Sequence, residues 1–119
     1  MVKTLSEAQE QCLFIAWCRM HPVLKKVVFS INNGGMSSVQ WHAKRKKLGE
    51  RPGVSDIFIP LPTKKYHGLW IEMKNKKGGV KSLEQVYWTN LMNELGYSAH
   101  FAHGFESAKN IAIEYLSDL

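Results

Sequence analysis

The sequence is poor in cysteine, which argues against a fold held together by disulfides or by structural zinc. Its 119 residues include two cysteines, Cys12 and Cys18. The two stand six positions apart in a predicted helix, so they point in different directions and cannot form a local disulfide. No CxxC pair and no histidine partner stands at zinc spacing. We therefore predict two free thiols in the core and no structural zinc site.

Long apolar segments are also missing. No apolar run approaches the ~18 residues that cross a bilayer, and the N-terminal stretch MVKTLSEAQEQ turns polar too early for a signal peptide. We expect an intracellular, cytoplasmic protein with no membrane partner. Hydrophobic residues still make up 45% of the chain, which is enough for the core of a single domain over residues 1–119.

Acidic residues are outnumbered by basic ones. The chain has 10 Asp and Glu against 16 Lys and Arg, a net charge of +6. The excess is clustered at 44–51, 64–65 and 74–81. Clustered positive charge favours a polyanionic partner, most often nucleic acid, although a solvated basic surface explains it equally well.

The residue patterns predict alternating helices and strands. Ser82 and Gln85 have the spacing of a capping box, and Gly96 is a good helix C-cap. Strands 55–60 and 67–74, joined by a short loop, predict a hairpin. We therefore predict an α/β three-layer sandwich, in which a mixed sheet of about four strands is flanked by helices. Helices are expected over 7–20, 38–49, 82–95 and 105–116, and strands over 27–31, 55–60, 67–74 and 98–103.

Three charged residues stand in strands that should be apolar. The stretch GLWIEMKNKKGG, 68–79, carries Glu72 and Lys74 two positions apart, so they share one face of a strand. Asp56 opens the preceding strand, where a lone aspartate is costly unless it is paired or bound to a cation. If the strands are neighbours, the two carboxylates and the backbone carbonyl of Met73 make an oxygen site for Mg²⁺. The alternative is a surface ion pair with Asp56 as a strand-start cap, since a bare E-x-K is common.

A cation at this place would bring hydrolytic chemistry. It would lower the pKa of a bound water and polarise a scissile phosphate. Lys74 would hold the attacking water or neutralise the charge that grows on the phosphate. No covalent nucleophile is needed. The pattern thus predicts phosphodiester hydrolysis that depends on Mg²⁺ or Mn²⁺.

The succession of motifs resembles the PD-(D/E)XK nuclease superfamily and, more narrowly, the virus-type replication-repair nuclease (VRR-NUC) family. The resemblance implies a restriction-endonuclease-like fold and a metal-dependent, structure-selective DNA endonuclease. It further implies a homodimer that acts in replication, repair or recombination on branched DNA such as Holliday junctions, and it points to phage or prophage. The segments that carry it are SEAQEQ near the N-terminus, INNGG at 31–35, KKLGERPGVSDIFI at 46–59, GLWIEMK at 68–74, SLEQVYW at 82–88 and ELGY at 94–97.

The resemblance also implies roles for individual residues. Asp56 and Glu72 would be the metal ligands and Lys74 the catalytic lysine. The acidic motif reads Val54-Ser55-Asp56 where the family has a Pro-Asp step, a change that the superfamily tolerates.

Two helix residues have both a family role and a plain structural explanation. Glu7 matches the family's N-terminal acidic position and would add a ligand, with Glu10 as its rival; as a first-turn acid it also complements the helix dipole. Gln85 matches a glutamine beside the active site, and the capping box alone explains it as well.

The basic segments supply candidates for gripping the DNA backbone without reading sequence. Asn33 and Gly34 would offer backbone N–H groups to a phosphate, or form a plain turn. Trp70, Tyr87 and Trp88 are interpreted as core or as a dimer surface. The predicted side-chain contacts come from Lys44, Arg45, Lys47, Arg51, Lys76 and Lys77.

The sequence is also compatible with other functions. A non-catalytic DNA-binding module on the same fold is the main alternative, but carboxylates without a metal would repel DNA. The chain is short for the base-reading insertions of a restriction enzyme. RNA stays open as a substrate, because no residue can be shown to read a 2′-hydroxyl.

Overall fold

The computed structural model describes residues 4–31 and 39–119. Within this part, no helix has both the length and the apolar character needed to cross a membrane. The elements in chain order are α1 (Glu7–Arg19), the 3-10 helix η1 (Leu24–Lys26), β1 (Phe29–Ser30), α2 (Val39–Lys47), β2 (Ile57–Ile59), β3 (Leu69–Lys74), α3 (Leu83–Glu94), β4 (Ser98–His103) and α4 (Phe105–Leu116).

The four strands form one mixed sheet in the order β1-β2-β3-β4. β1 and β3 each run antiparallel to β2, and β3 runs parallel to β4. β2 and β3 form the predicted hairpin, with Ile57 opposite Ile71. The parallel pair is joined through α3, because parallel neighbours need a crossover connection.

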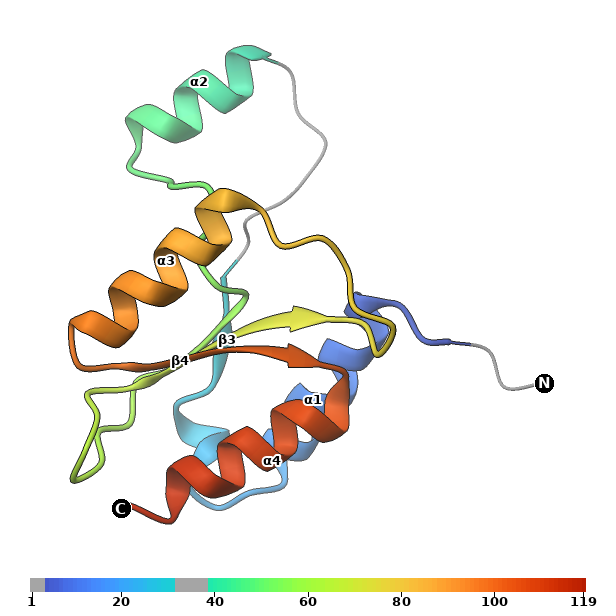
Figure 1. Ribbon diagram of the computed structural model, residues 1–119, viewed down its shortest axis with the longest axis vertical. Coiled ribbons are helices and arrows are strands. Elements are labelled where there is room, and N and C mark those ends of the chain that lie inside the picture. The colour runs from blue at the N-terminus through green and yellow to red at the C-terminus, as the bar shows by residue number, and fades with distance from the viewer. Residues whose placement is uncertain (1–3, 32–38) are drawn as a thin grey trace.

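Helices cover both faces of the sheet, as predicted. In Figure 1, α3 lies on one face of β3 and β4, and α1 and α4 lie on the other. Because β3 is covered on both sides, all of its residues are buried except the half-buried Trp70. A strand of this kind would be apolar throughout on packing grounds alone.

One side of β3 is apolar. Leu69, Ile71 and Met73 alternate along the strand and join the main core, which also contains Phe14 and Cys18 from α1. This face packs against the amphipathic stripes of α1 and α4. Its burial removes water from the backbone of β3 and holds the strand in register.

The other side of β3 faces α3 and changes from aromatic to polar along the strand. The Trp70 ring stands at 87° to the Trp88 ring of α3, with 5.4 Å between ring centroids. Four positions further on, Lys74 is hydrogen-bonded to Gln85 of α3. Glu72 lies between them and shares their face, because side chains alternate along a strand. The predicted shared face of Glu72 and Lys74 is confirmed.

The first predicted strand is shorter than expected. The segment 27–31 was expected to be extended, but only β1 within it pairs with β2. The backbone N–H groups of Val27 and Val28 both donate to the carbonyl of Leu24. The chain is therefore still turning at these residues and cannot join the sheet before β1. The other predicted elements are present, with ends shifted by at most two residues where they are described.

The two cysteines differ in environment. Both thiols are free, as predicted. Cys18 is buried, and burial raises its pKa to about 12. Cys12 is exposed, so its predicted place in the core is wrong. Six positions along a helix place the two side chains about 120° apart around its axis, so Cys12 lies off the buried face that carries Cys18.

Candidate active site

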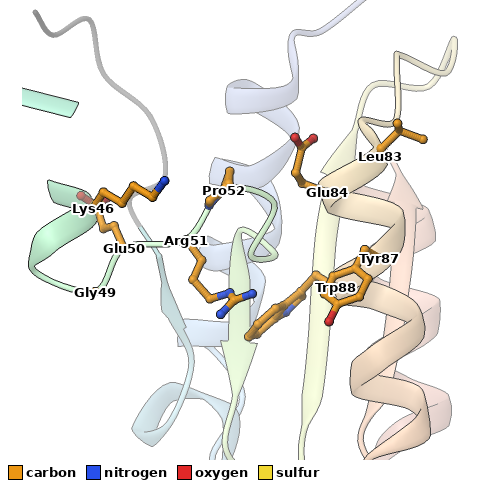
Figure 2. Close-up of a pocket in the computed structure, with 9 residues that line it drawn as sticks. All are labelled: Lys46, Gly49, Glu50, Arg51, Pro52, Leu83, Glu84, Tyr87 and Trp88. Carbon is orange, nitrogen blue, oxygen red and sulfur yellow. The ribbon is translucent and has the colours of Figure 1, made fainter. Parts of the chain in front are cut away.

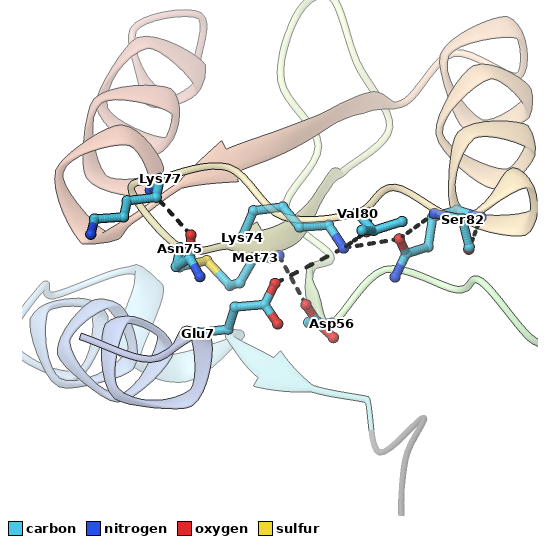
Figure 3. Close-up of polar contacts among 9 residues, drawn as sticks. Glu7, Asp56, Met73, Lys74, Asn75, Lys77, Val80 and Ser82 are labelled. Atoms are coloured by element: carbon cyan, nitrogen blue, oxygen red, sulfur yellow. Dashed lines mark hydrogen bonds and ion pairs between the residues drawn. The ribbon is translucent and has the colours of Figure 1, made fainter. Parts of the chain in front are cut away.

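Asp56 stands directly before β2, opposite Glu72 if the register of the hairpin is continued by one residue. Its Oδ2 accepts a 2.9 Å hydrogen bond from the backbone N–H of Met73 (Figure 3). This bond replaces the next rung of the β-ladder. The half-buried carboxylate is therefore fixed at the end of β3, where it was predicted to converge with Glu72.

The turn before Asp56 is held against α3 by Gly53. This residue has φ +85°, and a Cβ added to it would lie 2.4 Å from the backbone carbonyl carbon of Glu84. Only glycine meets both requirements, because other residues carry a Cβ and avoid positive φ. The Gly-x-x-Asp spacing thus has a structural cause: Gly53 lets the turn touch the first turn of α3, and Asp56 follows.

Glu72 is buried, with 4% of its surface exposed. Burial, and then the adjacent Asp56 carboxyl, raise the pKa of Glu72 to about 9, against the opposing effect of Lys74. Two carboxylates this close in a water-poor setting do not both ionise readily. More positive charge than Lys74 supplies is needed to hold both as anions at neutral pH.

The Met73 carbonyl points toward the same place. In an antiparallel strand the N–H and C=O groups of one residue point to the same side. Because the Met73 N–H donates to Asp56, its carbonyl is directed toward the β2 side of β3 as well. The predicted set of Asp56, Glu72 and the Met73 carbonyl therefore comes together at one end of the hairpin.

Lys74 is buried beside them, with 5% of its surface exposed. Its Nζ donates to the carbonyl oxygen of Val80 over 2.8 Å and to Oε1 of Gln85 over 3.0 Å, while Oε1 of Glu7 lies 4.0 Å away (Figure 3). An ammonium group has three N–H donors. Two of them hold the group in position, and the third is left for a further acceptor.

Gln85 has both of the roles that were considered for it. Its Oε1 accepts from the backbone N–H of Ser82 over 3.1 Å, and Ser82 Oγ accepts from the N–H of Gln85, which completes the capping box. The same Oε1 accepts from Lys74. The start of α3 is thus tied directly to the ammonium group.

The loop after β3 lies against Lys74. A bridge between Asn75 and Gly78 folds the loop back on itself. A Cβ on Gly79 would be 3.4 Å from Cδ of Lys74, so the loop backbone touches the lysine side chain. The sequence did not point to the Val80 carbonyl as a partner of Lys74. No side-chain pattern marks a backbone acceptor of this kind.

Of the two acidic residues on α1, Glu7 is the one near the cluster. Its half-exposed carboxylate is the one that lies 4.0 Å from Lys74 Nζ. Glu10 is buried and turned toward α4, where its Oε1 accepts a 3.0 Å hydrogen bond from the backbone N–H of Phe105. Glu10 therefore caps α4, a role that the sequence did not reveal.

The residues present fit a divalent cation. Mg²⁺ is typically bound by one or two carboxylates and keeps several waters, and a cation between Asp56 and Glu72 would favour the ionised form of both. Across residues 4–31 and 39–119 no three His, Cys, Asp or Glu side chains gather into a metal-binding group. Glu7 therefore does not complete a three-carboxylate set, and its role as a ligand through water stays a prediction.

Among the predicted phosphate contacts, Asn33 and Gly34 lie outside the described residues. Arg45 is engaged within the protein, because its guanidinium is paired with the carboxylate of Glu50. Lys44 is exposed on the same helix. Figure 1 shows this helix, α2, standing away from the three layers.

The remaining four basic residues lie on two sides of the cluster. Lys47 and Arg51 are exposed at the end of α2 and in the turn that follows. Lys76 and Lys77 are exposed in the loop after β3. The stem of Lys76 lies over Gly104, where an added Cβ would be 2.8 Å from its Cγ. Their contact with DNA stays a prediction.

Comparisons with known proteins agree with this geometry at the level of the fold. No family model matches the sequence. No curated protein matches it either. A solved structure named "VRR_NUC domain protein" superimposes with a TM-score of 0.82 at 23% identity, and the match covers 97% of this chain and 91% of that chain. The likeness shows that the two share a fold.

Proposed function

We propose that this chain is a divalent-cation-dependent nuclease of the VRR-NUC family that hydrolyses phosphodiester bonds in DNA. The observation that carries the proposal is the burial of Glu72 and Lys74 beside Asp56, at the end of two adjacent strands. Burying such groups in a strand that is otherwise core is costly. A role of these residues in phosphodiester hydrolysis would explain why the cost is tolerated, and the fold shared with the VRR_NUC domain protein supports that role.

In the proposed site Asp56, Glu72 and the Met73 carbonyl hold the cation. Bound there, the cation supplies the positive charge that lowers the pKa of a water and offsets charge on the phosphate. Lys74, fixed by Val80 and Gln85, directs its third N–H to the attacking water or to a phosphate oxygen. The ammonium is effective because it is already oriented in a water-poor site.

Branched DNA and a homodimer are the parts of the proposal that the sequence resemblance supports. A two-fold dimer presents two identical sites, which suits the cutting of two strands of a symmetric junction. The exposed lysines on both sides of the hairpin end would contact the backbone on either side of the scissile bond.

The experiment is cleavage of labelled four-way junction, flap, single-stranded and linear duplex DNA, with matched RNA strands. Each substrate is incubated with Mg²⁺, with Mn²⁺ and with chelator. Wild type is compared with Lys74→Ala and with Lys25→Ala, which removes an exposed lysine of η1 far from the hairpin end. Circular dichroism confirms that both variants fold.

Cation-dependent cleavage of DNA that is lost in Lys74→Ala and kept in Lys25→Ala is the expected result. Cleavage restricted to the junction or flap would extend it to branched DNA. Binding to all substrates without cleavage in either cation would refute the proposal and leave a DNA-binding module. Cleavage of RNA alone would refute the substrate class.

A further inference from the structure

A second site is formed beside the carboxylate cluster. A pocket of about 600 Å³ opens between the turn after α2 and the first two turns of α3 (Figure 2). Its volume lies within the range of small-ligand sites. One wall is basic and the other is aromatic. The pocket is lined by Lys46, Arg51, Pro52, Glu84, Tyr87 and Trp88, among others.

The aromatic wall is already in place. Trp88 is held by Trp70, whose ring in turn stacks on Phe58 with 4.1 Å between centroids. Tyr87 is 58% exposed, so most of its ring faces outward and not into the core. Trp70, Tyr87 and Trp88 were interpreted from sequence as core or dimer surface; of the two on α3, only Trp88 is anchored in the layer beneath the helix. A rigid indole and an accessible phenol ring form a surface for stacking.

The basic wall carries two cationic side chains that pair with no residue in the described part of the chain. Within residues 4–31 and 39–119, the exposed side chains of Lys46 and Arg51 make no hydrogen bond or ion pair. The nearby acid Glu50 is paired with Arg45. In Figure 2 the guanidinium of Arg51 and the indole of Trp88 extend toward each other from the two walls. The pocket therefore offers cations and ring faces together.

Two lining residues of the pocket are followed in the chain by residues that frame the proposed active site. Glu84 lines it, and the next residue, Gln85, bonds Lys74. Pro52 lines it from the other side, and the following residue, Gly53, is in contact with Glu84. A nucleotide in the pocket would therefore be next to the residues that hold the scissile phosphate.

We propose that this pocket binds an unpaired nucleotide of the DNA strand. The base stacks on Tyr87 and Trp88, as exposed bases do on aromatic side chains. Its phosphates contact Arg51 and Lys46, and the Glu84 carboxylate accepts a hydrogen bond from an exocyclic amino group. A paired base cannot enter, since it is held in the duplex stack. The inference rests on the proposed function, which supplies DNA as the substrate. The pocket would then give the protein a preference for duplexes that contain an unpaired nucleotide.

The test uses two fluorescein-labelled duplexes of one sequence. In one a 2-aminopurine nucleotide is paired, and in the other it is a single-nucleotide bulge. Dissociation constants are measured by anisotropy in chelator, so that no cleavage occurs, and 2-aminopurine fluorescence reports stacking of that base. Tyr87→Ala and Arg51→Ala remove the two contacts. Tyr87→Phe keeps the ring, and Arg19→Ala removes an exposed guanidinium at the far end of α1.

Wild type is expected to bind the bulged duplex roughly 5- to 150-fold more tightly than the paired one, the range for stacking one base. Binding should quench 2-aminopurine in the bulge. Both effects should be lost in Tyr87→Ala, reduced in Arg51→Ala, and kept in Tyr87→Phe and Arg19→Ala. Should Tyr87→Ala fail to fold, Arg51→Ala carries the test, because its side chain has no partner among the described residues to lose.

Equal affinity of wild type for the two duplexes, or a bulge preference that survives Tyr87→Ala and Arg51→Ala, would overturn the inference. The cleavage assay with Lys74→Ala separates this outcome from failure of the proposed function. Cleavage without bulge preference would refute nucleotide binding in the pocket and support the nuclease activity. Bulge preference without any cleavage would refute the nuclease activity and support nucleotide binding in the pocket.

Discussion

Replacing Glu72 by glutamine is expected to stabilise the cation-free protein while removing its affinity for divalent cations. Burial and the adjacent Asp56 raise the pKa of Glu72 from 4.5 to about 9. At pH 7 the side chain is therefore ionised in the unfolded chain and protonated in the folded protein, so folding takes up a proton. This uptake costs about 1.4 kcal/mol for each pH unit above the unfolded pKa, on the order of 3 kcal/mol at pH 7. Glutamine is of similar size and avoids this cost.

Thermal unfolding followed by circular dichroism in chelator measures the effect. At roughly 4 °C per kcal/mol for a domain of this size, Glu72→Gln should unfold on the order of 10 °C higher at pH 7. The raised pKa makes wild type most stable below about 4.5 and less stable as the pH rises toward 9, so the advantage of the variant should vanish in acid. Glu94→Gln, which changes an exposed carboxylate at the end of α3, is the control and should shift little.

Addition of Mg²⁺ should reverse the order. A cation that binds only the folded protein stabilises it by about 4.1 kcal/mol at roughly one thousand times its dissociation constant, which exceeds the advantage of the variant. Wild type should gain this stability and Glu72→Gln should not. A variant that is no more stable than wild type at pH 7, and that gains as much from Mg²⁺, would refute the reasoning.

Three further changes test the framework of the site. Gly53→Ala should destabilise the folded protein by at least about 3 kcal/mol in chemical denaturation, because both its φ of +85° and the crowded Cβ oppose the substitution. Gly49→Ala is the control. That position has φ +99° but open space around it, so the variant should lose only about 1 kcal/mol. Burial lowers the pKa of His100, so the unfolded chain binds a proton at a higher pH than the folded protein does. Wild-type stability should therefore fall as the pH drops below about 6.5. His100→Gln should weaken this pH dependence, and His103→Gln, at an exposed position, should not. Glu10→Ala leaves the first backbone N–H of α4 without its acceptor and should cost about 1–3 kcal/mol in urea unfolding; an unchanged midpoint would contradict this role.

Much of the fold could be predicted because its signals are local. Alternation placed Glu72 and Lys74 on one face of β3, and the short connection between two apolar runs predicted the hairpin. The capping box at Ser82 located the start of α3 to within a residue. These features depend on backbone periodicity and on side chains close in sequence. The shared face of the E-x-K pair was therefore predictable without knowledge of the rest of the chain.

What could not be predicted depends on the path of the chain through space. The bond from Lys74 to the Val80 carbonyl exists because the loop after β3 folds back over the lysine. The cap that Glu10 gives to α4 joins segments 95 residues apart. The first strand was predicted too long because apolar, β-branched residues also pack well in a turn above a core. Sequence analysis uses residue composition and periodicity, and these long-range contacts alter neither of them.

The most direct test of the central claim is the position of Mn²⁺ in crystals of the wild-type protein, read from its anomalous scattering. The account predicts a peak at the end of the hairpin, coordinated by carboxylate oxygens of Asp56 and Glu72 and by the carbonyl of Met73, at about 2.0–2.2 Å as for other hard cations of this size. The peak should be missing in crystals of Glu72→Gln. No peak at this place at a concentration of Mn²⁺ that supports cleavage, or a peak at Glu10 in its stead, would contradict the account.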